Sequence, residues 1–226
     1  MRRSCLTVIL WCVGLVVSIW PARAGHFVFN FGSDLAANDW HYLSFPGRQG
    51  AQFRARGENT VVVRAEAGVG ILWHPVPLEL SGASYAQWRW RVMAGVSPTD
   101  LTQKGGDDRA LAIYFVFVDG PEAVENTDLM DLLRQGKGYL LMYVWGGFAT
   151  PGILPSPYFG GRGRTIVKRA ADTPMGVWFK ETADVRSDFR SAFGHLPGRL
   201  VAVAVSSDSD DTGGLNIAAV ADLEVN

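Results

Sequence analysis

Short runs of β-branched and aromatic residues recur along this chain, and clusters of Gly, Pro, Asn and Asp separate them. This pattern is typical of an all-β sandwich or barrel. The run at 88–92, Trp-Arg-Trp-Arg-Val, alternates strictly and places its apolar residues on one face, so we expect a half-buried strand there.

Other runs differ in which faces are apolar. Those at 111–118, 139–145 and 200–206 are apolar on both faces, which predicts central strands that neither face exposes to water. Residues 215–225 are apolar at every odd position and predict a long final strand. Shorter candidates lie at 27–31, 40–45, 60–65, 70–73, 165–169 and 177–182. Together these runs predict an antiparallel, jelly-roll-like β-sandwich of about ten strands.

Two short helices are expected to pack against the sandwich. The first, at about 128–135, follows Thr127 as a candidate N-cap. The second, at 185–193, follows Asp184, which can cap its first turn, and ends at Gly194.

Residues 1–24 have the pattern of a cleaved secretory signal peptide. Two arginines precede an apolar run at 6–20 that is too short to span a bilayer, and Ala-Arg-Ala at 22–24 matches a cleavage site. We therefore expect residues 25–226 to be one exported domain, periplasmic or secreted, without a transmembrane anchor.

Composition after the leader excludes several function classes. Three of the 21 Lys and Arg residues lie in the leader and all 22 Asp and Glu residues follow it, so the remainder has four more acidic than basic groups and nucleic acid is not an expected partner. Both cysteines, Cys5 and Cys12, also lie in the leader. Thiol catalysis, disulfides and cysteine-ligated zinc are therefore excluded from the mature chain.

The segment 208–214, Asp-Ser-Asp-Asp-Thr-Gly-Gly, resembles the start of a calcium loop. Oxygen ligands at Asp208, Asp210 and Thr212 could converge on one calcium ion, although the twelfth loop position is Ala219 where an EF-hand needs a glutamate. The alternative is a polar hairpin whose aspartates bond to turn amides.

A second acidic turn, Asp107-Asp108-Arg109, precedes the strand expected at 111–118. If that strand is antiparallel to the one before Asp208, both acidic turns lie at the same end of the sandwich and could share a metal or ligand site. Turn chemistry alone is again the alternative.

The segment 146–163 is glycine- and proline-rich, contains Tyr158 among its aromatic residues and leads into Arg164. Connections of this length are commonly functional, and aromatic rings offer flat faces to sugars, so we interpret it as a binding rim with Trp145 facing the ligand. The alternative is a loop that covers a sheet edge, with Trp145 at the margin of the core.

Recognisable catalytic motifs are sparse. Glu181 with Asp184 or with Asp107 could form the carboxylate pair of a glycosidase. The competing interpretation makes Asp184 a helix cap and Glu181 a salt-bridge partner.

Several spaced motifs together resemble the bacterial family called domain of unknown function 3047. They are the runs at 88–92, 104–109, 145–147, 177–184, 188–194 and 208–214. The resemblance implies a bacterial exported protein and supplies no activity, cofactor or catalytic residue. The final strand is also similar to the closing strand of carbohydrate-binding jelly rolls, which is an analogy of fold alone.

These observations favour a protein that binds a glycan or another cell-envelope ligand. Two alternatives remain: a module that binds a protein partner in the envelope, and a glycoside-active enzyme. The candidate ligand-binding residues are Trp145, Asp107, Asp108, Arg109, Tyr158, Arg164 and Glu181, and the candidate cofactor is calcium.

Overall fold

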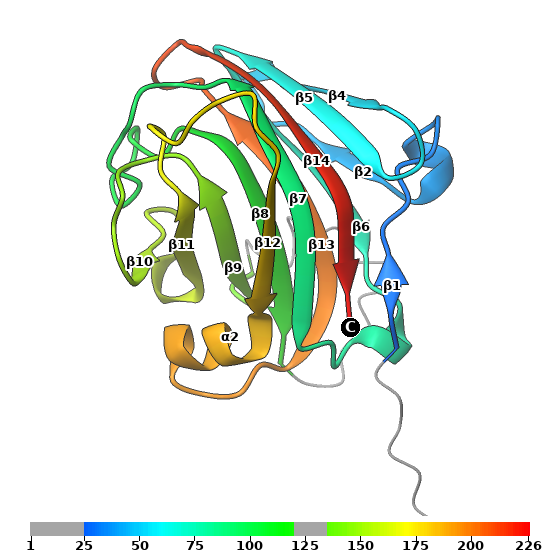
Figure 1. The fold of residues 1–226 in the computed structure, drawn as a ribbon. Helices are drawn as coiled ribbons and strands as arrows, with labels where there is room; N and C mark the ends of the chain where they lie inside the picture. The colour runs from blue at the N-terminus through cyan, green and yellow to red at the C-terminus, as the bar shows by residue number, and fades with distance from the viewer. Residues whose placement is uncertain (1–24, 120–134) are drawn as a thin grey trace, which may run out of the picture.

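The computed structural model describes residues 25–119 and 135–226, and it shows two β-sheets packed face to face (Figure 1). In the six-stranded sheet the order is β12-β7-β14-β5-β4, with β1 paired to β14. Its strands are β1 (Phe27–Val28), β4 (Gln52–Ala55), β5 (Thr60–Glu66), β7 (Tyr85–Ala94), β12 (Phe179–Asp184) and β14 (Leu215–Val225).

The eight-stranded sheet has the order β10-β11-β9-β8-β13-β6-β2, with β3 paired to β6. Its strands are β2 (His41–Leu43), β3 (Gln49–Gly50), β6 (Gly68–Pro75), β8 (Arg109–Val118), β9 (Gly138–Trp145), β10 (Ile153–Pro155), β11 (Gly163–Arg169) and β13 (Arg199–Asp208). All pairs are antiparallel except β11 with β9 and β3 with β6.

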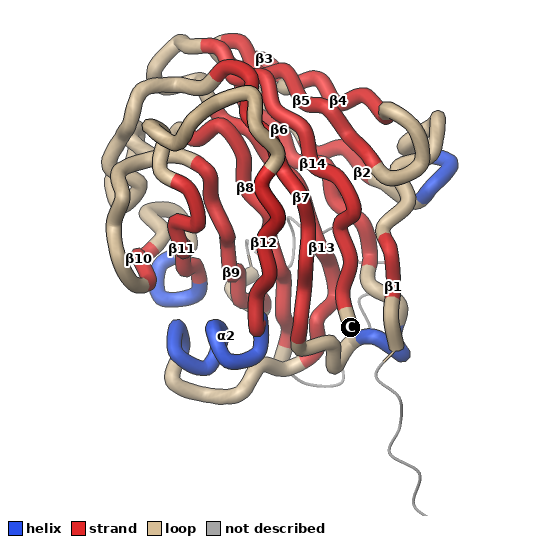
Figure 2. Tube along the Cα trace, viewed as in Figure 1, coloured by secondary structure: helices blue, strands red, loops and turns tan. Residues whose placement is uncertain are grey.

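Helical segments lie at the periphery of the sandwich (Figure 2). They are the single turns η1 (Ala36–Asn38), η2 (Leu78–Leu80) and η3 (Gly160–Arg162), and the helix α2 (Val185–Phe193). The caps predicted for α2 are confirmed, because the Asp184 side chain accepts a hydrogen bond from the Ser187 amide and Gly194 ends the helix in the left-handed conformation. The other predicted helix, at about 128–135, falls outside the described residues apart from Gln135.

The all-β sandwich predicted from the sequence is confirmed. The runs at 111–118, 139–145 and 200–206 are central strands, and the final strand has the predicted bounds. The described residues contain 14 strands where about ten were expected, because short strands such as β3, β4 and β10 carry too few residues to show a pattern. No helix in the described ranges is long and apolar enough to cross a membrane.

Strand β8 is buried on both faces, and this property positions the candidate site. Leu111, Ile113 and Phe115 face the core between the two sheets. Their neighbours Tyr114 and Val116 belong to a second apolar cluster with Leu140 and Ala204, which lies on the other face of the eight-stranded sheet. That outer face is therefore apolar as well.

Candidate ligand-binding site

A cavity of about 430 Å³ lies on the outer face of the eight-stranded sheet. We call it the outer cavity. Its apolar lining comes from four strands and from two loops, and consists of Val69, Ile71, Tyr114, Val116, Leu140, Ala204, Phe45, Pro46, Tyr158 and Phe159. Its charged lining consists of Arg48, Asp107, Arg109, Asp208, Asp210 and Asp211. One part of the cavity is therefore apolar and aromatic, while another is strongly charged.

The charged part exists because the two acidic turns meet. Strands β8 and β13 are antiparallel, and their register places Asp208 opposite Arg109. The sequence predicts that the two acidic turns share one end of the sandwich if these strands are antiparallel. They are antiparallel, and both turns lie at that end. Sequence alone could not show this, because strand pairing is a tertiary property.

Arg109 is buried at the centre of the charged part. Its guanidinium donates to the hydroxyl of Tyr114 at 2.6 Å and to the carbonyl and carboxylate of Asp107, and it lies 3.4 Å from the carboxylate of Asp208. Burial alone would lower the pKa of Arg109, but Tyr114, Asp208 and Asp107 outweigh it and raise the pKa. Arg109 therefore keeps its positive charge.

Gly146 lets the end of β9 approach Arg109. A Cβ on residue 146 would lie 2.7 Å from Cβ and 2.9 Å from Cα of Arg109, so a larger residue would displace this backbone. The polar network continues through Tyr114, whose hydroxyl also accepts a bond of 2.8 Å from Ser206.

Asp208 has an unusual environment for a carboxyl group. The residue is 6% exposed, and its Oδ1 atom has no hydrogen-bond partner among the described residues. Burial raises the pKa of Asp208 to about 8, with further contributions from Asp210 and Asp107, although Arg109 opposes the rise. A buried carboxyl with an unpaired oxygen needs either a proton or a cation nearby.

Asp108 joins the two acidic turns. It is fully buried, and one of its oxygens accepts bonds from the amide of Thr212 at 2.7 Å and from the Thr212 hydroxyl at 2.6 Å. The other oxygen accepts a longer bond of 3.4 Å from the Asp211 amide. Asp108 thus fixes the turn that follows β13 against the segment that precedes β8.

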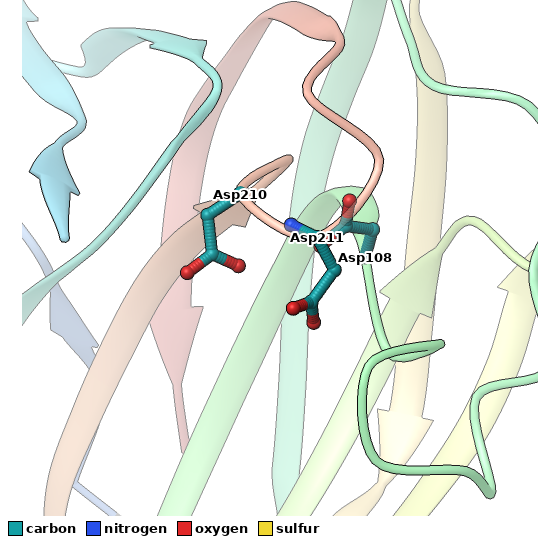
Figure 3. Close-up of side chains that lie close together, drawn as sticks. All are labelled: Asp108, Asp210 and Asp211. Atoms are coloured by element: carbon teal, nitrogen blue, oxygen red, sulfur yellow. The ribbon is translucent and has the colours of Figure 1, made fainter.

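Three carboxylates come together on these turns. Asp108, Asp210 and Asp211 each present an oxygen, and these oxygens lie within 4.8 Å of one another (Figure 3). Arg48, from the loop between β2 and β3, lies 3.0 Å from Asp210 and 3.8 Å from Asp211. Of the residues predicted to hold calcium, the structure places Asp210 in this cluster, while Asp208 pairs with Arg109 and the Thr212 hydroxyl is bonded to Asp108.

The loop after β9 contributes the aromatic rim. Tyr158 is 52% exposed and lines the outer cavity, as does Phe159, which packs on the outer apolar cluster. The same loop forms β10, which pairs with β11 at the sheet edge, so it both covers an edge and borders the cavity. Arg164 lies elsewhere, with its guanidinium 5.4 Å from the ring centre of Phe193.

Three residues considered for binding or catalysis have other roles. Trp145 is only 1% exposed and packs edge-on against Trp90 and Phe179 in the core, so it does not face a ligand. Glu181 accepts hydrogen bonds from Trp90 at 3.1 Å and from Arg169 at 2.7 Å, and thereby links β12 to the end of β11. Asp184 caps α2.

Some residues of the cavity had no clear signal in the sequence. Arg48 stands in a short connection with no motif, and Phe45 is the last residue of the strand expected at 40–45 but lies beyond the end of β2. Tyr114 stands in the run at 111–118, which predicts a strand buried on both faces, and its hydroxyl is the only polar side-chain group in that run.

A known protein family matches most of this chain. The model of the family described as "Protein of unknown function (DUF3047)" matches residues 38–224. The chain belongs to this family. The suspected membership is confirmed, and the DUF3047 segment includes both acidic turns and nearly all of the sandwich. A search of curated proteins finds no match.

Solved structures with similar arrangements have low sequence identity. The family 11 carbohydrate-binding module of the cellulosomal cellulase Lic26A-Cel5E of Clostridium thermocellum is 8% identical, with 90% of this chain and 95% of that chain covered and a TM-score of 0.44. The xyloglucanase domain of NopAA, a type three effector from Sinorhizobium fredii, is 10% identical, with 92% and 98% covered and a TM-score of 0.45. Likeness at this level does not bear on function.

Proposed function

We propose that this DUF3047 protein is an exported binding protein that takes a glycan or another cell-envelope ligand in the outer cavity. The observation that carries the proposal is the combination, in one cavity of about 430 Å³, of an apolar aromatic part and a charged part. Sites for small ligands have this character, and this volume is within their usual range.

Each part of the cavity suits a different portion of a sugar-like ligand. The exposed ring of Tyr158 and the neighbouring Phe159 offer apolar surface to the flat faces of a sugar ring. Carboxylates such as Asp210 and the guanidinium of Arg48 offer charged hydrogen bonds to hydroxyl groups. The leader at 1–24 supports an envelope location for such a ligand.

The glycosidase alternative has less support. Glu181 is occupied by Trp90 and Arg169, and Asp184 is occupied as the cap of α2, so neither carboxylate is poised over the outer cavity. Asp107 lines the cavity and pairs with Arg109 at 3.2 Å. A pair of free carboxylates on opposite sides of a bond is what that chemistry needs.

Glycan binding is tested by comparing two matched loop variants. The purified protein is passed over a panel of bacterial and plant glycans, in calcium and in chelator, and affinities of the hits are measured by calorimetry. Tyr158→Ala removes an aromatic ring that lines the cavity, and we expect about a tenfold loss of affinity, the equivalent of roughly 1.4 kcal/mol.

Phe148→Ala is the control, because Phe148 stands in the same loop, is 56% exposed and does not line the cavity. Binding that Phe148→Ala retains and Tyr158→Ala weakens supports the proposal. Absence of glycan binding in both arms, or equal affinities for the two variants, refutes it. N-terminal sequencing of the exported protein tests the location, with Gly25 as the expected first residue.

A further inference from the structure

We propose that the acidic end of the outer cavity is a binding site for a hard divalent cation, best suited to calcium, held by the carboxylates of Asp108, Asp210 and Asp211 beside Asp208. The proposal does not depend on glycan binding, since it concerns these side chains alone. Two independent observations support it, the geometry of three oxygens and an unpaired buried carboxyl oxygen.

The three oxygens have a spacing that suits one cation. Calcium takes oxygen ligands at about 2.3–2.6 Å, so two ligands on opposite sides of the ion lie at most about 5 Å apart. The oxygens of Asp108, Asp210 and Asp211 lie within 4.8 Å of one another. A set made only of carboxylates favours hard cations over zinc or copper, which prefer nitrogen and sulfur ligands.

Asp208 supplies the second observation. Its side chain lines the same cavity and is 9% exposed, and its Oδ1 atom has no hydrogen-bond partner within residues 25–119 and 135–226. The other oxygen of this carboxyl group, Oδ2, lies 3.4 Å from the Arg109 guanidinium. Oδ1 is buried without a donor in the described part of the chain, and a cation beside it would compensate for that burial.

The charges around the cavity point the same way. Its lining includes the carboxylates of Asp107, Asp210 and Asp211, the buried carboxyl group of Asp208, and two guanidinium groups, those of Arg48 and Arg109. Asp108 adds a further carboxylate behind them. Arg109 is committed to Asp107, Tyr114 and Asp208, so Arg48 is the cation that faces the cluster directly. The cluster therefore carries an excess of negative charge.

Arg48 gives the proposal a directional test. Its side chain is 50% exposed and reaches Asp210 at 3.0 Å from a separate loop. A bound cation and this guanidinium compete for the same carboxylate, because both need its negative charge. If the cluster binds a cation, removal of the Arg48 charge should therefore tighten cation binding. If Arg48 alone neutralises the cluster, the same change would destabilise the protein without any tighter binding.

The experiment measures calcium and magnesium binding to chelator-stripped protein by calorimetry, with thermal unfolding in parallel. We expect one calcium site with a Kd of about 10⁻⁴ to 10⁻³ M, as in extracellular calcium modules, and a higher unfolding temperature with calcium than with chelator. Asp211→Asn should weaken binding about tenfold, and Arg48→Gln should tighten it severalfold.

Asp222→Asn is the matched control. Asp222 is also an ion-paired aspartate, with Arg89 at 2.6 Å, but it lies in the other sheet. The Asp222→Asn variant should therefore bind calcium with the same affinity as the unaltered protein.

Terbium luminescence sensitised by nearby tyrosine gives a second readout on the unaltered protein, so a variant that fails to fold does not prevent the test. No terbium emission that calcium displaces, and no calorimetric or thermal response at about 10 mM calcium, would overturn the proposal. Equal losses in Asp211→Asn and Asp222→Asn, or no tightening in Arg48→Gln, would also overturn it.

Discussion

The bonds between Asp108 and Thr212 should hold the two acidic turns together, and their loss can be measured as stability. Asp108 is fully buried and accepts two short hydrogen bonds from Thr212, one from the amide and one from the hydroxyl. A hydrogen bond to a charged group contributes about 1.5–3 kcal/mol. Asp108→Ala removes the acceptor for both bonds, so we expect the free energy of unfolding to fall by about 3–5 kcal/mol.

A double-mutant cycle isolates the contribution of the hydroxyl. Thr212→Val removes the hydroxyl with little change of shape, and it leaves the hydrogen bond from the backbone amide of residue 212 to Asp108 in place. Thr212 is exposed, so we expect this single change to cost only about 1–2 kcal/mol. In the double variant the hydroxyl bond is already lost, and the two losses should overlap by at least about 1 kcal/mol.

Urea unfolding followed by tryptophan fluorescence measures the four proteins of this cycle, in chelator so that no cation contributes. The expected result is a lower midpoint with an unchanged slope, since slope reports the surface exposed on unfolding. A coupling energy below about 0.5 kcal/mol would mean that the two residues act independently. That result would refute the role assigned to Asp108 in joining the turns.

Three further predictions concern residues away from the cavity. Glu181→Gln weakens the bond to Arg169, so it should cost about 1–2 kcal/mol by urea unfolding and leave ligand affinity unchanged, and a change in affinity would contradict its structural role. Trp145→Ala should cost about 3–5 kcal/mol because it leaves a large hole in the core, and a cost near zero would refute its placement there. Burial lowers the pKa of His74, with opposing effects from the Pro75 carbonyl and Asp39 and a smaller lowering from His41. The unfolded chain therefore binds the proton more readily, so the free energy of unfolding should fall as the pH drops below about 6.5. This fall should be smaller in His74→Phe, and identical pH profiles of the two proteins would contradict the role of His74.

Much of the fold could be predicted because the signals are local. The central strands β8, β9 and β13 are apolar on both faces, and α2 has an acidic cap and a terminal glycine, so their positions follow from periodicity and capping. Strands such as β3, with two residues, and β10, with three, are too short for periodicity and are defined by their partners. The parallel pairing of β11 with β9 likewise has no local signal.

The sequence predicts the acidic residues of the candidate site better than it predicts the other residues of the site. Both acidic turns stand out in the sequence because carboxylates are concentrated there beside a pair of glycines. Trp145 shows the limit of the same reasoning, since a tryptophan at a strand end fits a binding platform or a core margin equally well, and packing against Trp90 decides for the core. Arg48 comes from a distant loop, so only the tertiary structure brings it to Asp210.

The pairing of β8 with β13 connects the fold to the proposed site. Because the register places Asp208 opposite Arg109, the turn after β13 lies against the segment before β8, and Asp108 can bond to Thr212. A shift of this register by one residue would move Tyr114 from the outer cavity into the core and separate the carboxylates. The same strands are apolar on both faces, which fixes the register by burial on each side. Hydrophobic burial in the sandwich therefore opposes the mutual repulsion of the acidic groups, and it keeps them together with or without a cation.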